Sequence, residues 1–298
     1  MSDVTVTSPI DEIAGVHPVT SPSRPARSVW SLLGQMALKV LGVVVSIAVV
    51  LGAWQLFLTL FHVNHFIGRG PLDVWRYVTT GDDAAAARSR LLHNSYTTLE
   101  DAFIGLAAGT GAAIICAIAF NLNRSIEQTF MPIAMVLRSV PLVAMTPLIA
   151  LIFGRGLLSV TVIAGIVTFF PTLVNLTFGL KSVPPSALDL MYAYGANPQT
   201  TLMKVQLPCA LPSLFASARI AAPGAIIGAL LAEWLATGKG LGYLMLQSVT
   251  TFQLDRLWAA VAIITVFSVV LYNIISVIEG SVLSKYAPDR GTGDPVGL

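Results

Sequence analysis

The chain has 298 residues, of which 55% are hydrophobic and 11% are charged, and its mean hydropathy is +0.78. Ordinary globular proteins carry about 25% charged residues, so this composition indicates an integral membrane protein. The net charge of +2 is too small to argue for nucleic-acid binding, and two cysteines in or beside apolar segments, Cys116 and Cys209, imply neither a disulfide framework nor a metal cluster.

The first segment, residues 1–39, is expected to be a mobile tail, because it is rich in Ser, Pro, Val and Thr and its charges show no helical period. A secretory signal peptide is not expected, since the apolar run begins too late. A transmembrane domain is predicted over residues 40–280, followed by a C-terminal tail over residues 281–298.

Six stretches are mainly apolar over about 20 residues, the length that a membrane-spanning helix needs. They predict an all-α membrane protein with six transmembrane helices in one domain. The predicted spans are residues 40–61, 99–120, 131–153, 159–180, 214–235 and 257–277.

A longer polar stretch separates the first two spans. Its segment from Pro71 to Tyr77 carries apolar and aromatic residues typical of a membrane interface. Asp82 and Asp83 precede four alanines and predict a helix start. His62 and His65 lie three residues apart, but no third ligand accompanies them, so we predict no metal site.

Small residues and prolines mark places where the spans pack or bend. The pairs Gly105 with Gly109 and Gly224 with Gly228 have the four-residue spacing that lets two helix backbones approach. The third span contains Pro141 and Pro147, which remove backbone hydrogen bonds and predict a kinked helix beside a pore.

The longest polar interruption between two strongly apolar segments is the stretch 181–213. Leu188, Met191 and Tyr192 share one face of a short predicted helix, and Gly195 is placed to end it. Asn197 followed by Pro198 predicts the start of a second short helix. Two short helices bent about this joint favour docking into another protein.

This stretch resembles the loop of the permease subunits of binding-protein-dependent ABC importers, whose motif is E-A-A, three residues, G, nine residues, I, one residue, L-P. Gly195, Val205, Leu207 and Pro208 match at the right spacing, whereas Asp189 replaces the glutamate and Leu-Met replaces the two alanines. The segments 138–156 and 240–245 also resemble the nitrate, sulfonate and taurine branch of these permeases.

The resemblance implies a cytoplasmic loop between the fourth and fifth spans that docks a dimer of ABC ATPases. ATP and magnesium would be bound by those partners and no cofactor by this chain. A second permease copy or sister permease would complete the pore, and an extracytoplasmic binding protein would deliver a small anion or a pyrimidine-like precursor. The implied docking residues are Asp189, Gly195, Ala196, Asn197, Pro198, Val205, Leu207 and Pro208.

Arg138, Pro141, Pro147 and Glu233 are the candidate pathway residues. A carboxylate such as Glu233 near the end of a span is costly unless it faces a cavity or a partner, so it either braces the outer pathway or is an interfacial residue solvated by headgroups. Arg138 is either a pathway cation or a helix-end anchor.

The chain contains no phosphate-binding loop G-x-x-x-x-G-K-[ST], no nucleophile elbow and no H-E-x-x-H pair, so it is not expected to be an enzyme. An ion-coupled secondary transporter stays an alternative, although that class would predict internal repeats and paired intramembrane carboxylates. The bias of cationic residues favours cytoplasmic termini in the cell membrane. This topology places seven of the 17 Lys and Arg residues outside: Arg69, Arg76, Arg88, Arg90, Arg155, Lys239 and Arg256.

Overall fold

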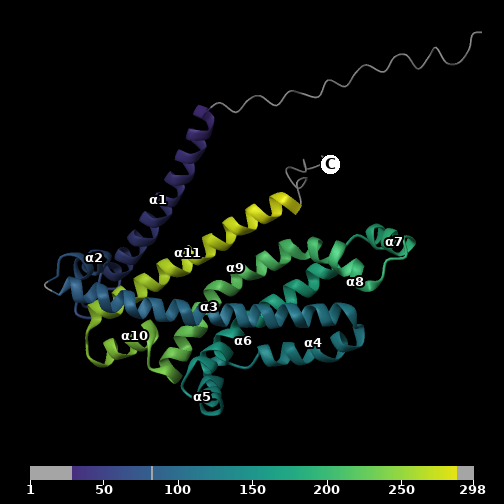
Figure 1. Ribbon diagram of the computed structural model, residues 1–298. Helices are drawn as coiled ribbons and strands as arrows, with labels where there is room; N and C mark the ends of the chain where they lie inside the picture. The colour runs from purple at the N-terminus through teal and green to yellow at the C-terminus, as the bar shows by residue number, and fades with distance from the viewer. Residues whose placement is uncertain (1–28, 82, 287–298) are drawn as a thin grey trace, which may run out of the picture. The chain divides into compact units, whose positions relative to one another are not determined.

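The computed structural model describes residues 29–81 and 83–286, and all regular structure within them is helical (Figure 1). Most of the two predicted tails, residues 1–28 and 287–298, lies outside these ranges, whereas residues 29–39 and 281–286 are helical. The elements are α1 (Val29–Leu60), α2 (Pro71–Thr79), α3 (Ala84–Leu122), α4 (Arg124–Arg138), α5 (Leu142–Phe153), α6 (Leu157–Lys181), α7 (Pro185–Ala193), α8 (Pro198–Thr201), η2 (Leu202–Gln206), α9 (Leu207–Ala232), η3 (Glu233–Thr237), α10 (Gly240–Thr250) and α11 (Leu254–Tyr286).

The chain divides into a compact unit that ends at Leu56 and a second that begins at Phe57. The apolar part of α1 within the described side chains is Val45–Leu60. This part is shorter than the about 20 residues of a spanning helix, so the first predicted span at 40–61 stays a prediction.

Four helical segments in the described ranges are long and apolar enough to cross a membrane, and a bent helix pair makes up to five. They contain the predicted second, fourth, fifth and sixth spans. The predicted second span is the C-terminal part of α3, which has 39 residues. At 1.5 Å per residue α3 is about 58 Å long, nearly twice the apolar thickness of a bilayer. It begins directly after Asp83, where the sequence predicted a helix start.

The third predicted span is not one kinked helix. It is split into α4 and α5, which are bent by 103° relative to one another across three residues. Pro141 disfavours helical backbone at the residue before it and provides no amide hydrogen, so the chain turns instead of kinking. Pro141 immediately precedes α5, whereas Pro147 lies inside that helix.

The centre of the second unit is a junction where α3, α6 and α9 meet around Ala164. A Cβ added at Gly105 would lie 2.2 Å from Ala164 Cβ, and one at Gly228 would lie 2.6 Å from Ala164 Cα. A Cβ at Gly109 would lie 2.0 Å from the Oγ1 of Thr168, a residue whose hydroxyl donates to the Gly105 carbonyl oxygen at 3.3 Å. The prediction that these glycines permit close helix packing is therefore confirmed.

The long helix α3 connects two differently built ends of this unit. Figure 1 shows α7 and α8 at one end of α3 and α10 at the other. At the first end the Asn121 side chain donates to Gln206 Oε1 at 2.7 Å. At the second, the Leu241 amide donates to Thr98 Oγ1 at 2.8 Å. Both ends are thus fixed to the same helix.

Candidate functional site

Within the polar interruption, residues 194–197 form a tight turn between α7 and α8. The amides of Gly195 and Ala196 donate to the carbonyl oxygens of Tyr192 and Met191 at 2.9 Å each. Gly195 has a φ of +67°, and no heavy atom lies within 4 Å of where its Cβ would be. Glycine is required here by the left-handed backbone and not by lack of space. The predicted helix end at Gly195 is confirmed.

The next helix begins where the sequence predicted it. Asn197 Oδ1 accepts a hydrogen bond from the Thr200 amide at 2.7 Å, and Pro198 is the first helical residue. The prediction of a separate second short helix is wrong, however, because the helical run continues from Pro198 to Thr237. A π-helical turn, η2, links α8 to α9 and keeps the run unbroken.

The loop between α6 and α9 presents an exposed surface on a buried base. Asp189 is exposed, and Tyr192 and Tyr194 are 87% and 83% exposed. Leu202 is only 3% exposed and belongs to a buried cluster with Leu176, Leu180 and neighbours from α3 and α9. We call the exposed residues Asp189, Leu190, Tyr192 and Tyr194 the loop surface.

The predicted apolar face of α7 is only partly covered. Leu188 and Met191 are half-buried, but Tyr192 on the same face is exposed. A groove of about 400 Å³ runs between the end of α3 and this loop, and its lining includes Leu188, Tyr192, Ala196 and Pro198. Val205, Leu207 and Pro208 are half-buried behind the loop surface.

Glu233 lies at the other end of the unit and is completely buried. Its Oε2 accepts a hydrogen bond from the Gly242 amide at 2.6 Å, so the carboxylate faces the first turn of α10. A negative group at a helix N-terminus is favoured by the unpaired amides and the helix dipole. Glu233 is therefore not an interfacial residue solvated by headgroups.

Two glycines make room for this buried carboxylate. A Cβ at Gly240 would lie 2.1 Å from Glu233 Oε1, and one at Gly242 would lie 2.7 Å from the Leu230 carbonyl oxygen. Gly238 and Gly240 have φ values of +68° and +79°, which turn the chain sharply from η3 into α10. The same segment, 240–245, carried part of the family resemblance.

The other pathway candidates lie on the bent helix pair. Arg138 is exposed in the last turn of α4 and lines a cavity of about 150 Å³ together with Met145 and Phe170. Pro141 and Pro147 are exposed as well. Of the four candidates, only Arg138 lines this cavity, and the hydrogen bond to Glu233 comes from Gly242.

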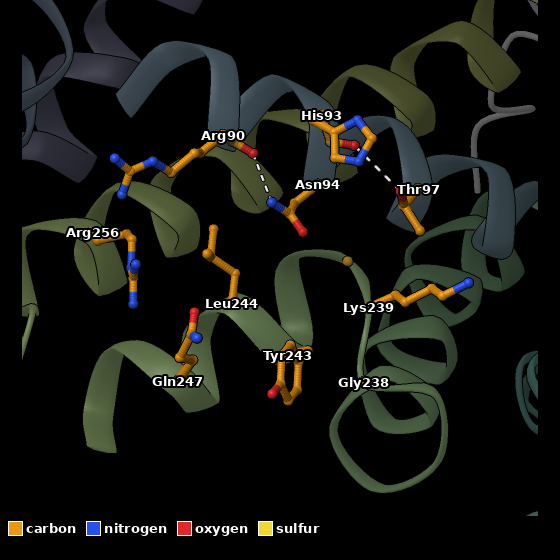
Figure 2. Close-up of a pocket in the computed structure, with 11 residues that line it drawn as sticks. Arg90, His93, Asn94, Thr97, Gly238, Lys239, Tyr243, Leu244, Gln247 and Arg256 are labelled. Atoms are coloured by element: carbon orange, nitrogen blue, oxygen red, sulfur yellow. Dashed lines mark hydrogen bonds between the residues drawn. The ribbon is translucent and has the colours of Figure 1, made fainter. Parts of the chain in front are cut away.

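A cavity of about 520 Å³ lies between α3, α10 and α11 (Figure 2), and the sequence pattern did not predict it. The prediction of membrane topology was the only one that used Arg90, Lys239 and Arg256. An arginine in the first turn of an apolar span was the one available signal. The cavity is lined by Arg90, His93, Asn94, Thr97, Gly238, Lys239, Gly240, Tyr243, Leu244, Gln247 and Arg256.

No group of three or more His, Cys, Asp or Glu side chains that could hold a metal ion is found in the described part of the chain. His65 contacts Arg69 at 3.1 Å and Asp73 at 3.5 Å.

Comparison with known proteins gives consistent matches along most of the chain. Residues 109–283 match the family model of the binding-protein-dependent transport system inner membrane component. A probable ABC transporter permease protein of Haemophilus influenzae is 32% identical, over 80% of this chain and 94% of its own. The riboflavin transport system permease protein of Chloroflexus aurantiacus is 30% identical, over 88% of this chain and 95% of its own.

A solved structure has the same fold. It is an inward-facing conformation of the MetNI methionine ABC transporter, which aligns with a TM-score of 0.59 at 19% identity and covers 65% of this chain and 97% of the matched chain.

Proposed function

The chain belongs to the binding-protein-dependent transport system inner membrane components, the permease subunits of ABC importers, and from this premise we propose that the loop surface docks a partner ATPase. The protein is a multi-pass inner membrane component and is not itself an ATPase; ATP is bound by the partner subunit. Membership of this family replaces the alternative of an ion-coupled secondary transporter.

The observation that carries the docking proposal is the contrast between exposed and buried residues of the loop. Exposed tyrosines are common anchors at protein interfaces, because they bury a large area with few rotatable bonds. Tyr192 and Tyr194 project from a segment held by buried Leu202 and by the hydrogen bond from Asn121 to Gln206. A force on the loop surface would therefore reach α3 and α9.

The complete permease domain is proposed to be residues 40–280, with six spans that include α1 and the α4–α5 pair, and with tails at 1–39 and 281–298. Cytoplasmic termini place the loop surface inside and α10 outside. A second permease copy or sister permease would complete the pore, and an extracytoplasmic binding protein would deliver the solute. We propose a small anion of the sulfonate, taurine or nitrate type as that solute, with a pyrimidine-like precursor as the competing class.

The proposed mechanism uses the helical run from Pro198 to Thr237 as a lever. Closing of two ATPases on ATP would bring the two loops of a permease dimer together, and the run would transmit this motion about 60 Å along its axis. Glu233 sits near its far end against α10, so it is placed to brace the outer part of the path. Arg138, Pro141 and Pro147 are proposed to lie along the path at the bent helix pair.

Site-directed cross-linking tests the docking proposal. In a background with Cys116→Ala and Cys209→Ala, the exposed Ala193 is replaced by cysteine and labelled with a photoactivated benzophenone maleimide. We expect a covalent adduct with the ATPase subunit. Thr80→Cys, exposed beyond the end of α2, is the control and should give none. An adduct from position 80 and none from position 193 would show that the ATPase docks elsewhere.

A further inference from the structure

The cavity between α3, α10 and α11 contains a buried arginine. Arg256 is 6% exposed. Its Nε donates to Ser248 Oγ at 2.7 Å and its Nη2 to Thr251 Oγ1 at 3.4 Å. A guanidinium has five N–H donors, so three of them have no partner among these contacts.

No carboxylate within the described residues pairs with this arginine. The neighbouring Asp255 forms an ion pair with Arg69 at 2.9 Å, and Glu233 binds the Gly242 amide. A buried charge is costly unless an opposite charge or hydrogen bonds compensate it. Two hydroxyl groups satisfy only part of this need.

The other ionisable residues of the lining are two cations, one histidine and one tyrosine, Tyr243. Arg90 and Lys239 are exposed at the rim, His93 is exposed on α3, and the lining contains no Asp or Glu. Figure 2 shows Arg256 and Gln247 facing the same space, whereas the side chains of Arg90 and Lys239 extend outward in opposite directions. Both long side chains are flexible enough to turn toward a bound anion.

We propose that this cavity, the α10 cavity, is a binding site for a free small oxyanion, with Arg256 as its fixed anchor and Arg90 and Lys239 as mobile contacts. The site would hold the transported solute at the outer mouth of the permease. This role rests on the proposed function, because the proposed topology is what places α10 outside.

The size and the connections of the cavity support this assignment. Its volume of about 520 Å³ is in the range of small-molecule sites, which is about 300–1,000 Å³. Gly240 lines the cavity and lies directly against Glu233, which is near the end of the long helical run from the loop. A single glycine, Gly240, therefore connects the cavity to the helical run.

Calorimetric titration tests the proposal on the full transporter complex in nanodiscs of neutral phosphatidylcholine. The probes are methanesulfonate, taurine and nitrate, and choline is the cation control. We expect at least one anion, and not choline, to bind the wild type. Arg256→Gln should weaken binding by about tenfold or more, the effect of losing a charge-assisted hydrogen bond.

Two further variants keep the test independent of folding. Arg90→Gln combined with Lys239→Gln changes only exposed side chains and should weaken the same anion by a smaller factor. Arg155→Gln, an exposed arginine outside the cavity, should leave the affinity unchanged. Equal affinities of the wild type and all of these variants would overturn the proposal.

Three other outcomes identify which proposal has failed. If no anion binds but the binding protein still stimulates ATP hydrolysis, this inference is wrong and the proposed function stands. If the ATPase does not assemble with the permease while anions still bind, the docking proposal is wrong and the anion site stands. If anion binding disappears in phosphatidylglycerol nanodiscs and anionic lipid copurifies with the wild type but not with Arg256→Gln, the cavity is a headgroup site and the inference is overturned.

Discussion

The segments packed near the two ends of α3 each require a glycine, but for different physical reasons. At the loop end, Gly195 has a left-handed backbone and empty space around its Cβ position. At the α10 end, Gly240 has a left-handed backbone and a carboxylate 2.1 Å from the same position. The loop end is shaped by a local backbone rule, and the α10 end by packing around a buried carboxyl group.

Because of this difference, substitutions at the loop end should mainly change function, and substitutions at the α10 end should mainly change stability. A side chain added at the loop end meets solvent or a partner protein, so the folded bundle can tolerate it. A side chain added at the α10 end must displace Glu233 or break its bond to Gly242. Substitutions at the two ends should therefore differ most clearly when folding and coupling are measured separately.

The largest effect is expected for Gly240→Val. It combines left-handed strain with overpacking against Glu233, and the free energy of unfolding should fall by roughly 2–5 kcal/mol. Reversible unfolding in mixed micelles measures this loss. Gly238→Val is the matched control, because its φ is +68° but its nearest atom, Tyr243 Cε2, lies 3.9 Å away. Equal losses at both positions would show that packing against Glu233 does not matter.

Glu233→Ala should have the next largest effect. It leaves the buried Gly242 amide without its acceptor, which costs about 1–3 kcal/mol. In this background Gly240→Ala should lose its clash and retain only the strain of about 1–2 kcal/mol. A double-mutant cycle in the same unfolding assay measures the coupling. Additive effects of the two substitutions would contradict the geometry around the carboxylate.

Gly195→Val is expected to change coupling more than folding. Its left-handed strain costs about 1–2 kcal/mol, but the side chain has space, so the permease should still be recovered folded. ATP hydrolysis stimulated by the binding protein should fall sharply because the loop surface is misplaced. Gly195→Asn is the control, since Asn tolerates this backbone, and it should retain stimulation. Full stimulation in Gly195→Val would argue against docking at this loop.

Local features of the sequence predicted the loop end well. The roles of Gly195 and Asn197 follow from helix-capping chemistry, which needs only neighbouring residues. Close packing at Gly105, Gly109 and Gly228 followed from spacing alone, although the partner Ala164 did not. Six apolar stretches indicated the helical class, but they did not show that α3 extends far beyond its predicted span.

The cavity at the α10 end could not be predicted because residues far apart in the sequence line it. Arg90 lies in α3 and Arg256 in α11, and only the tertiary fold brings them to one cavity. The bend between α4 and α5 was underestimated for a related reason. Pro141 signals a break in the helix, but the angle of 103° depends on what the two halves pack against.

The smallest loss of unfolding free energy is expected for Asp255→Asn, which can be compared with the loss for Glu233→Ala at the same end of the unit. Asp255 pairs with Arg69 at 2.9 Å, but its side chain is 39% exposed, whereas Glu233 is fully buried. Exposed ion pairs contribute about 0–1 kcal/mol and are screened by salt. Asp255→Asn should therefore lower the unfolding free energy by less than about 1 kcal/mol, and the difference should shrink at high salt. A loss as large as that of Glu233→Ala would mean that the ion pair between α11 and the α1–α2 connection, and not the buried carboxylate, holds this end together.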